Sequence, residues 1–242
     1  MQRWRQRLSL AAVIVAAVVL LAAAGRELAT LKDRFTLART VPVRSPVDGM
    51  TYAVHDAYPD AAAAADMLAR INRRVVALLR HLKRAYVRPD RGGAPALARR
   101  YPGRARAVRR LLSRYNPDNV AENSPFDPEG DSAYSLDKGS LIALCLRDRP
   151  PRKGQKPTRS KGDGALHSID TITFVMIHEM AHVAIDEVDH PPAFWATFKF
   201  LLLEAERAGL ARFPDYRAEP VDYCGVKVDY SPAFDPAQTT LQ

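Results

Sequence analysis

The segment Ile169–Ile185 constrains the fold most, because it is largely apolar and yet carries two histidines and a glutamate. It contains no Gly or Pro, so it predicts a buried helix. Within it, His178 and His182 are four residues apart, which places them one above the other on a helix. Glu179 is rotated by about 100° from His178. Polar side chains in such a helix need partners, so two solvated histidines are a poor explanation.

This spacing is typical of a metal site. The form H-E-x-x-H lets two histidines bind one zinc ion while the glutamate acts on a water molecule. A catalytic zinc ion takes three protein ligands and keeps a fourth position for water. We expect His190 to be the third ligand, because a chain reversal near Asp186 or Glu187 would return it to the metal. The alternative is a glutamate on the next helix, Glu204 or Glu206, as in thermolysin-like enzymes.

Neighbouring residues fit this arrangement. Pro191 and Pro192 suit the first turn of a new helix, where a missing N–H costs nothing. Phe194 and Trp195 would then pack under the site. Asp186 and Asp189 are weaker ligand candidates, and we expect either of them to orient a ligand histidine instead. His167, about three turns before the two histidines, is not expected to be a ligand.

Further segments carry a resemblance to a known family. H-E-x-x-H followed by H-P-x-x-F-W resembles the zincin metallopeptidases of the WLM and SprT-like type. It resembles more closely a group of uncharacterised metallopeptidase-like proteins of large DNA viruses, some algae and some bacteria. Over residues 50–230 the likeness extends to Tyr134–Gly139, Cys145–Asp148, Phe198–Leu202 and Pro220–Gly225. It implies a zincin-like fold holding Zn²⁺. The chain departs from the metzincins, whose second histidine is followed by a Gly and a closer third ligand.

These residues predict a zinc metallopeptidase that cleaves peptide bonds, with Glu179 as general base. An oxyanion donor is also needed. Tyr223, or less favourably Tyr216, could supply it, and core packing is the competing role for both. Two other functions stay open: a zinc-dependent amidase acting on a non-protein substrate such as a cell wall, and a membrane-anchored metal-binding protein with little turnover. The intact Glu179 argues against the second, because metal binding alone does not need it.

The N-terminus carries a second strong pattern. Leu8–Ala24 is uncharged and almost wholly apolar, and three arginines precede it. A bilayer span needs about 17–25 such residues. We therefore predict a cytoplasmic tip and an uncleaved transmembrane signal anchor within residues 1–34, with the catalytic domain over 35–242. The arginines favour a cytoplasmic N-terminus and hence a single-pass protein whose domain is non-cytoplasmic. The alternative is a signal peptide cleaved after Ala22–Ala24, which gives a secreted protein.

Charge and cysteines add less. The net charge of +9 is concentrated before residue 115, and the predicted helix over 60–86 is rich in arginine. We favour a solvated helix face there, with contact to nucleic acid or anionic lipid as the alternative. Cys145 and Cys224 either form one disulfide in an oxidising compartment or remain buried thiols.

The remaining pattern predicts an α+β, zincin-like fold: a small mixed sheet, an active-site helix and packing helices. Strands are expected at Met50–His55 and Ser140–Leu146, and helices at Asp60–Tyr86, Arg104–Tyr115 and Pro191–Ala208. Residues 26–49 are expected to be a connector, 116–130 irregular and 149–164 a surface loop. We expect 140–146 to offer a free edge to an extended peptide; an internal strand is the alternative.

Overall fold

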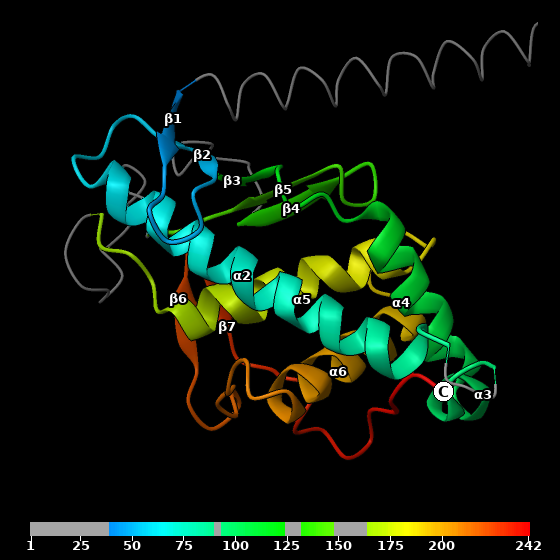
Figure 1. Cartoon of the computed structure of the whole chain (residues 1–242). Helices are drawn as coiled ribbons and strands as arrows, with labels where there is room; N and C mark the ends of the chain where they lie inside the picture. Colours follow the sequence, from blue (N-terminus) through cyan, green and yellow to red (C-terminus); the bar gives the residue numbers. More distant parts are fainter. Residues whose placement is uncertain (1–38, 90–92, 124–131, 148–163) are drawn as a thin grey trace, which may run out of the picture. The chain divides into compact units, whose positions relative to one another are not determined.

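The computed structural model describes residues 39–89, 93–123, 132–147 and 164–242 (Figure 1). Thr40–Gln242 forms one compact unit. The apolar run Leu8–Ala24, the boundary predicted after residue 34 and most of the loop predicted over 149–164 lie outside the described residues. Among the helices that are described, none combines the length and hydropathy of a bilayer crossing.

A five-stranded mixed sheet forms one layer, in the order β1-β2-β3-β5-β4. Its strands are β1 (Thr40–Arg44), β2 (Thr51–His55), β3 (Val120–Glu122), β4 (Ala133–Leu136) and β5 (Leu141–Leu144). β2, β3 and β5 are parallel, whereas β1 and β4 run antiparallel at the two edges. The predicted small mixed sheet is confirmed.

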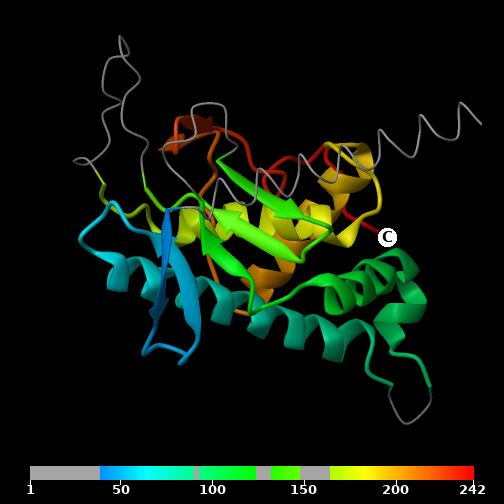
Figure 2. The same ribbon diagram turned by 90° about the horizontal axis from the view of Figure 1, so that it is seen from above.

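The described helices lie on one side of this sheet, and two of them pack directly against its strands (Figures 1 and 2). They are α2 (Ala61–Tyr86), α3 (Ala96–Arg100), α4 (Pro102–Arg114), α5 (Ile169–Ala184) and α6 (Pro192–Arg207). α2 packs against β1–β3, and α5 packs against β4 and β5 and, on its other side, α6. The apolar stripe of α2 explains its place: Leu68, Ile71, Val75, Leu78 and Leu82 are all buried.

Three sequence expectations were wrong in part. The connector predicted over 26–49 contains β1, and the segment predicted to be irregular over 116–130 contains β3. Each strand is short and lies between turn-forming residues, so its pairing with the sheet, rather than a local pattern, makes it a strand. The predicted free edge at 140–146 is also wrong, because β5 lies between β3 and β4.

The C-terminal part is joined to the sheet covalently. A small hairpin of β6 (Val221–Tyr223) and β7 (Val226–Val228) carries Cys224 in its turn. Cys224 forms a disulfide with Cys145 at the end of β5. The structure thus decides between the two roles left open for these cysteines.

Candidate metal centre

Helix α5 supplies two histidines from the middle of the core. The helix begins after Ser168, whose hydroxyl accepts a hydrogen bond from the Thr171 N–H at 3.1 Å. Every residue of α5 from Thr171 to Ile177 is buried, because the sheet covers one side of the helix and α6 the other. His178 and His182 are partly buried and their ring centroids lie 5.0 Å apart. The expected stacking along one helix face is confirmed.

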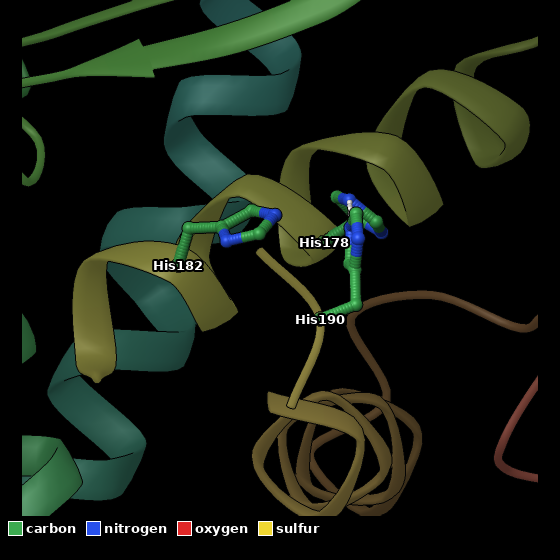
Figure 3. A group of neighbouring side chains, drawn as sticks. All are labelled: His178, His182 and His190. Atoms are coloured by element: carbon green, nitrogen blue, oxygen red, sulfur yellow. Dashed lines mark hydrogen bonds between the residues drawn. The ribbon is translucent and has the colours of Figure 1, made fainter. Parts of the chain in front are cut away.

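A short reversal brings the third histidine back to them. α5 ends at Ala184, shortly before the reversal expected near Asp186 or Glu187, and Ile185 is extended. Asp189 has a positive φ of 61°, and α6 then begins at Pro192. As a result the Nε2 atoms of His190 and His178 are 3.1 Å apart (Figure 3).

The three imidazoles have the geometry of a shared metal site. Their candidate ligand atoms all lie within 4.8 Å of one another. Two nitrogens bound tetrahedrally to one zinc ion at about 2.05 Å would be separated by about 3.3 Å, which is close to the 3.1 Å between His178 and His190. Imidazole nitrogens are ligands that zinc prefers. The residues therefore fit a zinc ion.

The Phe194 ring packs against the imidazole rings of all three histidines. Its ring centroid lies 4.8 Å from that of His178, 4.3 Å from His182 and 4.5 Å from His190. Its side chain is fully buried. Trp195 packs beside His190 at 5.7 Å. Both aromatic residues occupy the place predicted for them, and they restrict the orientation of the histidine rings.

Burial keeps His178 and His182 neutral in the absence of metal. Desolvation, together with smaller effects of the nearby His182 and His190, lowers the pKa of His178 to about 3. Desolvation likewise lowers the pKa of His182 to about 4, with smaller effects from His190 and Lys138. A neutral imidazole presents a nitrogen lone pair, which is the form that binds a metal. The site is thus prepared for a cation rather than for protons.

The predicted general base and the two predicted oxyanion donors lie in different surroundings. Glu179 is on α5 next to His178, and its side chain is buried. The Tyr223 hydroxyl donates to the carbonyl oxygen of Cys145 at 2.7 Å, and its ring packs on His167. Tyr216 is fully buried and packs against Phe174. The structure therefore places both tyrosines in packing roles, and a role for Tyr223 in oxyanion binding stays a prediction.

The two glutamates considered as alternatives to His190 make contacts away from the histidine cluster. Glu204 is buried, with one carboxylate oxygen 2.9 Å from His81 Nε2 and the other accepting from the Tyr86 hydroxyl at 3.1 Å. Arg207 also pairs with it. Glu206 accepts a hydrogen bond from the main chain of Phe213. Neither belongs to the histidine cluster, so His190 is the third candidate ligand.

Sequence reasoning missed the cations near the site. Arg110 and Arg114 pair with Asp186, so Asp186 does not orient a histidine as expected. Lys138 Nζ donates to the main-chain oxygens of His182 and Glu187. Lys138 lies in the segment Tyr134–Gly139 that carried the family resemblance, which was the available signal.

Comparison with known proteins finds uncharacterised viral relatives. The chain is 32% identical over half of its length to an uncharacterized protein of Acanthamoeba polyphaga mimivirus, covering 55% of that protein. It is 30% identical over 41% of its length to an uncharacterized protein of Invertebrate iridescent virus 6, covering 49% of it. The chain thus spans about half the length of the curated relatives it matches. No protein-family model and no solved structure matches it.

Proposed function

We propose that this chain is a zinc-dependent metallopeptidase of zincin type. The observation that carries the proposal is the cluster of His178, His182 and His190, with Glu179 adjacent to the first of them on α5. Three histidine ligands leave a fourth position for water, as in catalytic rather than structural zinc sites. Glu179 adds a proton-transfer group, which a purely structural site does not need.

In the proposed hydrolysis, the metal ion would activate the water and Glu179 would transfer the proton. A bound zinc ion would lower the pKa of a water molecule from 15.7 towards about 7 and polarise the substrate carbonyl. The Glu179 carboxylate accepts a proton from the attacking water and passes it to the nitrogen of the leaving amine. Phe194 and Trp195 hold the histidine rings from below and exclude water from that side.

The position of the sheet edge supports a peptide substrate. The edge strand next to the site is β4, and it packs against α5. Among the described strands, β4 pairs on one side only, with β5. An extended peptide could add to its other side through main-chain hydrogen bonds. We therefore transfer the substrate-edge role from 140–146 to Ala133–Leu136.

The disulfide supports a non-cytoplasmic location. Disulfides persist in oxidising compartments and are rare in the cytosol, and Cys145 and Cys224 are bonded here. This agrees with the anchor predicted over residues 8–24, whether it is retained or cleaved. An amidase acting on a non-protein substrate remains the second candidate, because the same site geometry serves any carbonyl carbon attacked by water.

A digest of a peptide library tests the proposal. The full chain is purified, its zinc content is measured, and the library is incubated with it, with it plus a chelator, and with it after zinc is restored. We expect cleavage that the chelator abolishes and zinc restores. A zinc-loaded protein that cuts no peptide but hydrolyses other amides would favour the amidase, and a protein without bound metal would refute both.

A further inference from the structure

Three cations from two other elements surround the end of the active-site helix. Arg110 and Arg114 come from the last turns of α4, and Lys138 comes from the turn between β4 and β5. All three contact the chain between His182 and Glu187. This is the stretch that leads from the second candidate metal ligand to the third.

The contacts are made with main-chain carbonyls that the helix leaves unsatisfied. The last four carbonyls of a helix have no N–H partner within it. Arg114 Nη1 donates to the carbonyls of Val183 at 3.0 Å and Ile185 at 3.2 Å. Arg110 Nη1 lies 3.5 Å from the Ala184 carbonyl. Cations at this end also interact favourably with the helix dipole.

Two further contacts hold the chain beyond the helix. Arg114 Nη2 donates to the Asp186 carboxylate at 2.6 Å, and Arg110 pairs with the other oxygen of the same carboxylate. Lys138 Nζ donates to the Glu187 carbonyl at 2.8 Å. The turn that presents Lys138 has positive φ at Asp137 and at Lys138 itself, a conformation that L-residues adopt at a cost. Strain of this kind persists where surrounding contacts hold it.

The same turn is packed directly against α5. A Cβ atom added at Gly139 would lie 2.9 Å from the Val183 side chain and 3.1 Å from the Arg114 carbonyl. Gly139 also has φ of 109°, which favours glycine. The turn, α4 and the end of α5 therefore meet with no room for a larger residue.

By contrast, the segment that carries His190 is not held by burial. All residues from Asp186 to His190 are exposed, and Val188 is 75% exposed. Within this segment, only the His190 ring packs against the aromatic residues of α6. Between Ile185 and Glu187, the carbonyls of these two residues accept hydrogen bonds from Arg114 and Lys138. The Asp186 N–H makes a local hydrogen bond to the Glu187 carboxylate at 3.2 Å.

We propose that Arg114 and Lys138 are positioning residues that hold the segment 185–190 so that His190 meets the metal bound by His178 and His182. This inference rests on the proposed metal site. Asp186 is about half exposed, so its ion pair with Arg114 contributes little to global stability. The contribution is local: the cations reduce the conformational freedom that metal binding would otherwise have to remove.

The test measures zinc affinity by competition with a chromophoric chelator, using the full chain and the variants Arg114→Gln and Lys138→Met. Removing groups that orient metal ligands costs about 10- to 100-fold in affinity, and we expect a loss in that range for each variant. Lys138→Arg should restore most of the affinity, because it can still donate to the Glu187 carbonyl. Arg109→Gln, an exposed arginine of the same helix, is the matched control and should bind as the parent chain does.

Amide exchange in the metal-free protein separates positioning from loss of fold. We expect faster exchange confined to residues 185–190 in both variants, with an unchanged thermal midpoint. If the parent chain binds zinc and the variants equal it in affinity and exchange, the inference is overturned and the proposed function stands. A parent chain that binds no zinc would overturn the proposed function and this role together.

Discussion

The Nε2 atoms of His178 and His190 lie 3.1 Å apart although the residues are 12 positions apart in the sequence and belong to different elements. His178 is partly buried and His190 is exposed, so burial of both rings does not explain why they meet. One metal ion between them would use a nitrogen lone pair from each imidazole. The pair therefore joins α5 to the segment that follows it at the candidate metal centre.

If Glu179 is the general base, a substitution there should reduce peptide hydrolysis without reducing zinc binding. Glu179→Gln keeps the size of the side chain and removes its ability to accept a proton. We expect unchanged zinc content and a fall in kcat/KM of about 10²- to 10⁴-fold, measured on a peptide found in the library digest. Glu219→Gln, at an exposed position, should behave as the parent chain. Full activity in Glu179→Gln would remove the peptidase mechanism.

The choice of third ligand predicts different effects at His190 and Glu204. His190→Ala should weaken zinc binding while the fold is kept, because His190 is exposed. Glu204→Ala should leave zinc affinity unchanged but lower the free energy of unfolding by about 1–3 kcal/mol, because Tyr86 and His81 lose a buried acceptor. Metal titration and urea unfolding of both variants check this. Loss of zinc in Glu204→Ala alone would reverse the assignment.

The lowered histidine pKa values predict acid sensitivity of the metal-free protein. Burial lowers the pKa of His178 to about 3 in the folded chain, whereas an unfolded histidine has a pKa near 6.5. Between these values the unfolded chain binds a proton that the folded chain does not. The free energy of unfolding should therefore fall as the pH falls below about 6.5, by at most about 1.4 kcal/mol per pH unit for this residue.

Urea unfolding with a chelator present, measured from pH 7 to pH 4, checks that slope. Carboxylates also titrate at the acid end, so the comparison is with His178→Gln, in which this contribution is absent. We expect the variant to show a shallower pH dependence than the parent chain. Parallel curves would mean that His178 titrates normally in the fold.

The disulfide predicts a large loss of stability on reduction. Cys145 and Cys224 are 79 residues apart, so their bond closes a long loop. Closing a loop of this length stabilises a protein by about 4.5 kcal/mol in the chain-entropy description. Reduction, or the double change Cys145→Ser and Cys224→Ser, should lower the free energy of unfolding by about 2–4 kcal/mol. Two free thiols in the unreduced, unfolded protein would contradict the bond.

Local sequence was enough for the helical part of the site. The spacing of His178 and His182 predicts their stacking because the helix repeat is set by the backbone and not by neighbours. The apolar run around them predicts burial, and Pro191 and Pro192 predict the start of α6, which the structure confirms. His190 followed because few residues separate it from the helix end, so its position has little freedom.

Only the tertiary structure decided the rest. β3 consists of three residues that become a strand through pairing with β5, and no local pattern in so short a segment could show this. That β4 rather than β5 is an edge of the sheet also depends on long-range pairing, because strand order is set by contacts between distant segments. The cations at the end of α5 come from residues 44 to 76 positions away in the chain. A sequence determines periodicity along an element, whereas contacts between distant elements arise only when the whole core packs.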